Sequence, residues 1–293
     1  KSLSISVNTN TTLIEKPNLN ARPFISSSDA IEIEQFLFDN GSYNATINSG
    51  YTRISPVVQI LLDRKNGIIS EQEASNQIDA LKLQSLNSDL LAYYYRPSLN
   101  QQYSININGG GSKNRYFLSA GYDNNSLEIK GSKDSRFTLN ASNTYILFGD
   151  KLELQAGVNF STNNTKSPSE GIEGAVDRPY YRLVDANGSP ASIDRYRRSW
   201  LDTIGGGKLL DWSYIPLEEQ EWLNNKSERI NYIFNVGVSY NINKDLQIKA
   251  LYRYSKGVYE HNNLRDKNSF YTRDLINQFS QVNYSNGNVE SPI

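Results

Sequence analysis

The fold of this chain is indicated by the stretch Arg229-Ile-Asn-Tyr-Ile-Phe-Asn-Val-Gly-Val-Ser-Tyr-Asn241. Every second residue from Ile230 to Tyr240 is apolar or aromatic, whereas the positions between them are mostly Asn, Ser and Gly. Because successive side chains of a β-strand point to opposite faces, this alternation predicts a strand with one apolar face. The same pattern recurs along a chain whose mean hydropathy is -0.59. Alternating strands in an otherwise polar chain are typical of a transmembrane β-barrel.

Seven strands of this kind are expected. Five precede the stretch above, with apolar faces that include Ile5, Ile105, Leu118, Leu139 and Val158, and a seventh follows it. The connections after the second, fourth and sixth strands are expected to be short, and those after the other strands long. Outer-membrane barrels have short periplasmic turns and long extracellular loops, so this sorting predicts an all-β, partial transmembrane antiparallel barrel of about seven strands. A soluble β-sheet domain would explain the alternation but not the sorting.

Two long insertions interrupt the strands, at residues 14–100 and 162–228, and we expect both to be extracellular and partly helical. In the first insertion, Ser55 followed by Pro56 predicts the start of a helix, and the capping box from Ser70 to Glu73 predicts the start of another. A third helix is expected at residues 28–39. Helices this amphipathic need a surface to pack on, so the insertion is expected to be folded.

The composition excludes several classes of function. The formal net charge of the 293 residues is -1, which argues against a nucleic-acid partner because such proteins carry clustered basic faces. The chain has no cysteine and a single histidine, His261, so thiolate and His-pair metal sites are excluded. We expect no metal and no cofactor. No run of about 18 apolar residues is present, so a transmembrane helix is excluded and a bilayer would be crossed by strands.

Three short motifs have ordinary structural interpretations. Gly109-Gly110-Gly111 lacks the frame of a phosphate-binding loop and predicts a hairpin turn. Asp185-Ala-Asn-Gly188 lacks the final glutamate of a calcium loop and predicts a turn. Glu218, Glu219 and Glu221 are expected in the first turn of a helix, where carboxylates complement the helix dipole. None of these motifs indicates catalysis, and no catalytic residue is expected.

Several longer motifs together resemble the SusC/RagA family of TonB-dependent outer-membrane transporters. Individually they are weak, but in this order and spacing, over nearly the whole chain, they are specific. The motifs are Ser55-Pro-Val-Val-Gln-Ile-Leu61, Arg64-Lys-Asn-Gly67, Asn100-Gln-Gln-Tyr103, Gly109-Gly-Gly111, Tyr116-Phe-Leu-Ser-Ala-Gly-Tyr122, Arg136-Phe-Thr-Leu-Asn140, Pro179-Tyr-Tyr-Arg-Leu183, Asp185-Ala-Asn-Gly188, Trp200-Leu-Asp202 and Leu210-Asp-Trp-Ser-Tyr214.

This resemblance implies a fold, a function and partners. It implies part of a large barrel in the bacterial outer membrane that imports glycan or peptide oligomers for nutrient uptake. A SusD-like surface lipoprotein would form its lid, and TonB, ExbB and ExbD would supply energy through an internal plug. We expect residues 1–293 to be the N-terminal portion of the barrel, without the plug. Seven strands cannot close a barrel of about 22 strands, so this chain alone is expected neither to catalyse nor to transport.

The aromatic residues of the second insertion are the candidate contacts for cargo or lid. They are Trp200, Trp212, Tyr214 and Trp222, which include all the tryptophans of the chain. Such rings stack on sugars and peptides, and they can equally form a small core of the insertion itself. The nearby Arg195, Arg197 and Arg198 could bind an acidic ligand or form a solvated loop face. The alternative function is a surface adhesin or a soluble glycan-binding β-domain, which would not depend on detergent.

Overall fold

The computed structural model describes residues 2–21, 24–168, 172 and 176–291. The chain divides into two compact units that interleave along the sequence. Unit 1 comprises Lys1–Lys16, Arg96–Ser167 and Asn224–Asn263, and unit 2 comprises Pro17–Tyr95, Pro168–Leu223 and Leu264–Ile293. Each unit has its own architecture and is described by itself.

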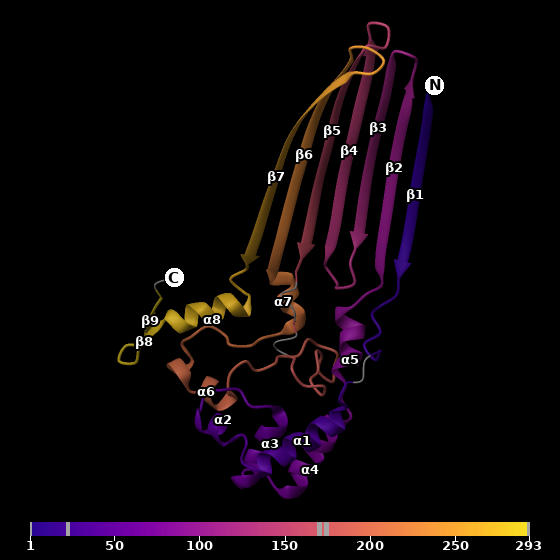
Figure 1. The fold of residues 1–293 in the computed structure, drawn as a ribbon. Coiled ribbons are helices and arrows are strands. Elements are labelled where there is room, and N and C mark those ends of the chain that lie inside the picture. Colours follow the sequence, from indigo (N-terminus) through magenta and orange to yellow (C-terminus); the bar gives the residue numbers. More distant parts are fainter. Residues whose placement is uncertain (1, 22–23, 169–171, 173–175, 292–293) are drawn as a thin grey trace. The chain divides into compact units, whose positions relative to one another are not determined.

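Unit 1 is built on a seven-stranded sheet in which each strand pairs with its neighbour in the sequence (Figure 1). The number and antiparallel arrangement of the strands agree with the sequence-based expectation. The strands are β1 (Ser4–Ile14), β2 (Ser98–Gly110), β3 (Asn114–Ser126), β4 (Lys133–Leu147), β5 (Leu152–Ser167), β6 (Leu223–Asn241) and β7 (Gln247–Arg265).

The pairing register aligns the apolar side chains of the first six strands on one face of the sheet. One row of directly opposite residues contains Ile5, Ile107, Leu118, Ala141, Val158 and Phe234. A row on the other face contains Asn8, Ser104, Gly121, Thr138, Ser161 and Asn231. A shift of one residue in any strand would exchange its two faces, so the continuity of both rows shows a well-specified register.

Neither face of this sheet is covered by a packed layer. On the apolar face, the exposed fractions are 40% for Leu118, 46% for Phe234 and 49% for Val236. Every buried apolar side chain among the described residues lies instead in unit 2. A contiguous apolar surface that the protein itself leaves exposed marks a site of contact with a membrane or another protein.

The connections differ from the expected sorting at one position. The connection after β3 spans only residues 127–132, whereas a long loop was expected there. The strands also extend beyond their apolar stretches, so the two long insertions span residues 15–97 and 168–222. The reason is that polar residues such as Asn125 and Asp134 continue the backbone ladder, and apolar periodicity does not reveal this extension. The hairpin turn expected at Gly109 to Gly111 is confirmed by the β2–β3 pairing.

Unit 2 contains the helices of the chain. Its main helices are α1 (Ser27–Asp39), α3 (Pro56–Lys65), α4 (Glu71–Lys82), α7 (Pro216–Trp222) and α8 (Phe270–Phe279). The shorter elements are α2 (Asn44–Asn48), α5 (Leu86–Asp89), the π-helical turn η1 (Leu90–Tyr94), α6 (Arg198–Leu201), the 3-10 turn η2 (Ile204–Gly207), and the hairpin β8 (Gln281–Asn283) and β9 (Asn288–Glu290). None of the described helices is both long and apolar enough to cross a membrane.

Both predicted helix starts of the first insertion are confirmed. The Ser55 hydroxyl accepts a hydrogen bond from the backbone N–H of Val58 at the start of α3. The Ser70 hydroxyl accepts one from the backbone N–H of Glu73 at the start of α4. The helix expected at residues 28–39 is α1, which begins at Ser27. Each capping side chain satisfies a backbone donor that the helix leaves free, so the local sequence fixes these ends.

The core of unit 2 joins the two long insertions. Ile31 of α1, Val57 and Leu61 of α3, and Ile78 of α4 pack with Tyr180 of the second insertion. Their exposed fractions are 4% or less, and Tyr180 is the largest of the fully buried side chains in unit 2. Unit 2 therefore has a packed core of its own, as expected for a folded insertion.

Candidate functional site

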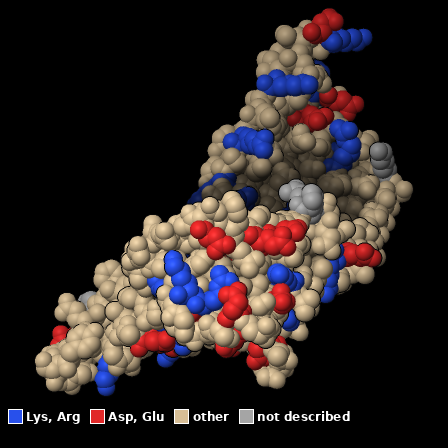
Figure 2. Space-filling view, turned by 90° about the horizontal axis from the view of Figure 1, so that it is seen from below, with Lys and Arg blue, Asp and Glu red and all other residues tan. Residues whose placement is uncertain are grey.

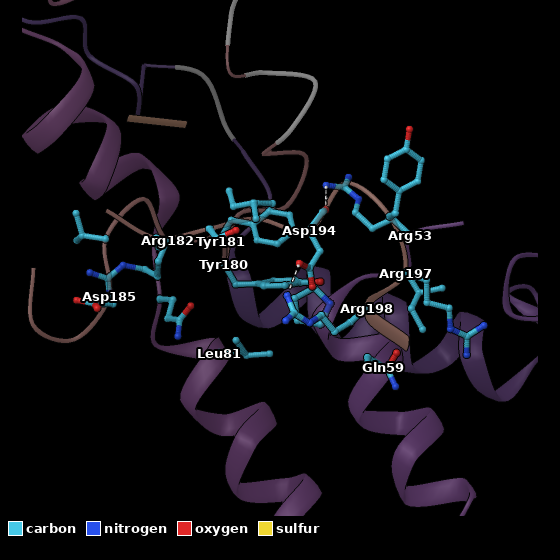
Figure 3. A pocket seen from close by; sticks show the side chains of 18 of the residues that line it. Arg53, Gln59, Leu81, Tyr180, Tyr181, Arg182, Asp185, Asp194, Arg197 and Arg198 are labelled. Atoms are coloured by element: carbon cyan, nitrogen blue, oxygen red, sulfur yellow. Dashed lines mark hydrogen bonds and ion pairs between the residues drawn. The ribbon is translucent and has the colours of Figure 1, made fainter. Parts of the chain in front are cut away.

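The candidate site is a pocket of about 520 Å³ within unit 2 (Figure 3). Its wall is formed by the start of α3, the end of α4 and the segment from Tyr180 to Arg198. The pocket therefore contains residues from both long insertions. Apolar side chains such as Ile54, Leu81 and Ile193 alternate with polar ones around it, which is typical of a ligand pocket with a few orienting groups.

A buried charged cluster fixes the floor of the pocket. The Tyr180 hydroxyl donates to the Glu34 carboxylate, and Arg178 Nε donates to the other oxygen of the same carboxylate at 2.7 Å. Burial and the neighbouring Glu34 charge raise the pKa of Tyr180, so this phenol remains a hydrogen-bond donor. Glu34 is only 4% exposed, and a carboxylate at this depth requires such partners. The cluster holds the second insertion against α1.

The arginines of the pocket are engaged within the protein. Arg53 donates to Asp177 at 2.9 Å and lies over the Tyr181 ring. Arg182 pairs with Asp89 at 2.8 Å, and Arg198 pairs with Asp202 at 3.2 Å and with Asp194 at 3.7 Å. Figure 3 shows Arg198 beside Asp194 and Arg182 on another part of the wall. These ion pairs neutralise much of the positive charge of the arginines. The pocket is therefore polar, but it does not attract anions strongly.

The chemistry of the pocket suits the binding of a ligand. Burial raises the pKa of the Asp194 carboxyl, and Arg198 acts in the opposite direction. The single histidine, His261, belongs to β7 of unit 1. Among the described residues, no group of three or more potential ligands could hold a metal ion. Tyrosine rings, guanidinium groups and side-chain amides around a partly apolar pocket can stack on and hydrogen-bond an extended polar ligand.

Two of the candidate aromatic residues form a cluster behind the pocket wall. The rings of Trp200 and Trp212 lie 5.6 Å apart, and both pack against Tyr196, at 5.3 and 5.4 Å. Tyr196 itself lines the pocket and donates a hydrogen bond to Asp274 at 2.9 Å. The two tryptophans are half-buried in this cluster. They support a pocket residue, and their role as contacts for cargo or lid stays a prediction.

The other two candidates, Tyr214 and Trp222, have different ring partners. The Tyr214 ring packs edge-on against Phe270 at 5.6 Å, with the Arg195 guanidinium 5.3 Å from the Tyr214 ring. Burial raises the pKa of Tyr214 to about 12 against the opposing effect of Arg195. Trp222 is the last residue of α7, and the Arg273 guanidinium lies 5.9 Å from the Trp222 ring. Arg273 also donates to the backbone carbonyls of Asp211 and Ser213, so it connects Trp222 with the segment that holds Trp212 and Tyr214.

Sequence reasoning missed the residues that contribute most to the pocket. Tyr180, Tyr181 and Arg53 were not singled out, although Pro179-Tyr-Tyr-Arg-Leu183 was among the motifs that carry the family resemblance. Arg197 and Arg198, from the arginine cluster, line the pocket. Asp185 accepts a hydrogen bond from the backbone N–H of Asn187 at 2.8 Å, which confirms the predicted turn. The sequence signal that could have identified this part of the pocket is the pair of adjacent tyrosines, Tyr180 and Tyr181, directly after Pro179.

On the face seen in Figure 2, acidic and basic side chains lie side by side and form no extended field of one sign. The numbers of the two kinds are also nearly equal, with 30 basic and 31 acidic residues in the chain. Nucleic-acid-binding surfaces present clustered basic residues. This face therefore presents interspersed charges of both signs.

Comparisons with known proteins were informative at the levels of sequence and fold. No protein-family model matches the chain. Over 180 residues, or 57% of the chain, it is 25% identical to the TonB-dependent receptor SusC of Bacteroides thetaiotaomicron, of which it covers 18%. Its fold is similar to the RagAB peptide importer in the closed-closed state, with a TM-score of 0.60 and 13% identity, and to the RagAB peptide transporter, with 0.56 and 15%. In both cases the match covers 92% of this chain and 30% of the RagAB chain.

These likenesses confirm two expectations. The chain resembles the SusC/RagA family in sequence and in fold, and its fold is a seven-stranded antiparallel β-sheet, similar to part of the RagAB structures, that the described strands do not close into a barrel. The relatives are a receptor and an importer, and neither is an enzyme. The chain spans less than a third of the length of SusC and of each of the two RagAB chains.

Proposed function

We propose that this chain forms part of a TonB-dependent transporter in the bacterial outer membrane, where it contributes strands of the barrel and extracellular structure for the import of glycan or peptide oligomers. Unit 1 crosses the membrane, and unit 2 lies outside the cell. A SusD-like lipoprotein covers the extracellular side, and TonB with ExbB and ExbD supplies energy to the complete transporter. Similarity to SusC and to RagAB supports each of these assignments.

The observation that carries the proposal is the uncovered apolar face of the seven-stranded sheet. Aromatic side chains occupy two levels of this face, with Tyr103, Tyr122 and Phe137 in one directly opposite row and Tyr116, Tyr145 and Tyr240 toward the other end of the strands. Aromatic girdles of this kind flank the apolar band of outer-membrane barrels at both interfaces. Apolar residues such as Ala120, Val158 and Val236 fill the space between the two levels.

Strand length supports the same placement. Tyr232 and Tyr240 of β6 are eight residues apart, which is about 27 Å along a strand. At a tilt of about 40°, this corresponds to about 21 Å along the barrel axis, close to the apolar band of about 25 Å. The distance between the two tyrosines therefore matches the height of the apolar band to within about 4 Å.

The pocket of unit 2 supports the proposal for cargo. Its tyrosines, guanidinium groups and amides suit a glycan or a peptide segment better than a small apolar molecule. Both cargo classes present hydroxyl, amide or carboxylate groups along an extended chain, and rings such as Tyr181 can stack on either. Titration of the intact protein with defined oligosaccharides and oligopeptides separates the two classes.

Sidedness is tested with single cysteines, because the chain has none of its own. Leu83→Cys places a thiol at an 89% exposed position of unit 2, and Lys244→Cys places one in the β6–β7 turn. A membrane-impermeant maleimide should label the first in intact cells and the second only after the outer membrane is permeabilised. Labelling of both only after permeabilisation contradicts the proposal. Recovery of the protein in the soluble fraction favours the alternative, an adhesin or soluble glycan-binding domain.

A further inference from the structure

Three lysines on neighbouring strands of unit 1 stand directly opposite one another. Lys133 of β4 pairs with Lys166 of β5, and Lys166 pairs with Lys226 of β6. This lysine row lies where β5 ends and β6 begins (Figure 1). All three side chains are exposed, and none forms an ion pair with another described residue.

The lysine row is on the same face of the sheet as the apolar band. Lys133 is four residues from Phe137 on β4, Lys166 is six from Phe160 on β5, and Lys226 is six from Tyr232 on β6. Even separations along a strand keep side chains on one face, and the register across these strands is continuous. The lysines therefore point outward, beyond the aromatic row that contains Phe137.

Such an arrangement is unfavourable unless an anion binds to it. Directly opposite residues of an antiparallel pair have Cβ atoms about 5 Å apart, and like charges in these positions destabilise the sheet. Ser135, Asn164 and Glu228 form the adjacent row and border a depression of about 340 Å³ together with the lysines. Glu228 accepts a hydrogen bond from the Thr162 hydroxyl at 3.4 Å, and Glu260, which also borders the depression, accepts one from the Asn262 amide at 2.9 Å. Three cations here face two carboxylates.

The depth of the lysine row matches the headgroup layer of a membrane. Four residues of strand between Phe137 and Lys133 span about 13 Å, or about 10 Å along the axis at a tilt of about 40°. Aromatic girdles lie at the membrane–water interface. The long side chain of a lysine near this level can place its ammonium group among the lipid headgroups. The row lies at the end of the strands that bears the long insertions, which faces outward in outer-membrane barrels.

We propose that Lys133, Lys166 and Lys226 bind the phosphate of a phosphorylated glycolipid headgroup in the outer leaflet. The lysines neutralise the phosphate, and the hydroxyl, amide and carboxylate groups of the depression hydrogen-bond the sugar hydroxyls. This inference rests on the membrane placement of unit 1 in the proposed function. It identifies a lipid site on the outer surface of the barrel, separate from the cargo pocket.

The test compares a triple variant with a matched control in the intact protein. Lys133→Gln, Lys166→Gln and Lys226→Gln together remove the row, whereas Lys151→Gln, Lys244→Gln and Lys249→Gln remove the same charge at the turn end of the strands. Each protein is reconstituted in zwitterionic phospholipid vesicles containing a small fraction of a phosphorylated glycolipid, and retained glycolipid is measured by native mass spectrometry. Each lysine near an anionic lipid surface contributes about a fivefold gain in binding, so the triple variant should bind about 100-fold more weakly.

Several results decide the question. Loss of glycolipid in the triple variant with retention in the control supports the lysine row, provided that both insert into vesicles equally. Equal retention in both overturns it, as does displacement of the glycolipid by micromolar inorganic phosphate, which would identify a site for soluble phosphate. A wild-type protein that inserts into vesicles but binds no glycolipid overturns the lysine row alone. Failure of the wild-type protein to insert contradicts the proposed function itself.

Discussion

Arginine at position 236 should severely destabilise the protein in the membrane, whereas arginine at position 235 should not. Val236 is on the apolar face, is 49% exposed and lies opposite Ala156 of β5. Asn235 is its chain neighbour on the polar face, opposite Gly157. The two substitutions introduce the same side chain into the same strand and differ only in the face on which it is placed.

The magnitude follows from the depth of Val236. It is four residues from both Tyr232 and Tyr240, so it lies about 10 Å from each aromatic level, at the midplane of the apolar band. Arginine on the lipid face costs about 2–4 kcal/mol at the midplane and about 0–1 kcal/mol near the interfaces. Since about 1.4 kcal/mol corresponds to a factor of ten, Val236→Arg should lower the folding equilibrium constant about 30- to 700-fold. Asn235→Arg should change it less than about fivefold.

The assay is the denaturant-induced unfolding of the intact protein in phospholipid vesicles, followed by the β-sheet signal in far-ultraviolet circular dichroism and by heat-dependent mobility in gels, because the three tryptophans all lie in unit 2. Val236→Leu serves as a control for changes in packing at the same position. Equal destabilisation by arginine at 235 and 236 would refute the assignment of the faces. Destabilisation by Asn235→Arg alone would show that the polar face meets the lipid.

Three further predictions concern unit 2. Tyr181→Ala should weaken cargo binding about tenfold in calorimetric titrations, as expected when an aromatic anchor is truncated, whereas Tyr284→Ala, at a position 75% exposed and outside the pocket, should leave it unchanged. Arg178→Ala should destabilise unit 2 by about 3 kcal/mol because it leaves the Glu34 carboxylate buried without its ion pair; unchanged hydrogen exchange of the α1 amides would contradict this. Burial raises the pKa of Tyr214 to about 12, while the unfolded phenol titrates near 10. The unfolded state therefore loses its proton first, and the stability of unit 2 should fall by about 3 kcal/mol as the pH rises from about 10 to 12. Tyr214→Phe should reduce this slope in pH-dependent thermal unfolding, and an identical slope would exclude Tyr214 as its source.

The strands of unit 1 were predictable because their apolar residues follow a period of two. Strand ends were less predictable, since residues such as Asn125, Asp134 and Lys166 pair in the ladder without any apolar signal. Helix starts at Ser55 and Ser70 were predictable because capping is a local interaction between residues close in sequence. Local chemistry and simple periodicity therefore account for most of the fold.

The pocket was not predictable in the same way, because its wall depends on contacts between residues far apart in the chain. Arg53 meets Asp177, and Glu34 meets Arg178 and Tyr180, across more than 120 positions in each case. No periodicity or spacing encodes such a pairing. The four aromatic candidates were chosen by residue type alone, and their partners in the structure, which are Tyr196, Phe270 and Arg273, lie far from them in the sequence or could not be read from it.

The two units derive their stability from different sources, and this difference predicts how their functions separate. Unit 2 has a buried core around Leu61 and Tyr180, so its folding depends on its own packing. The sheet of unit 1 leaves its apolar face uncovered, so in the proposed function the free energy that would come from a core comes from contact with lipid. Substitutions in the pocket should therefore change cargo binding without changing membrane insertion, and substitutions such as Val236→Arg should do the reverse. A pocket variant that fails to insert would show that the two units do not fold independently.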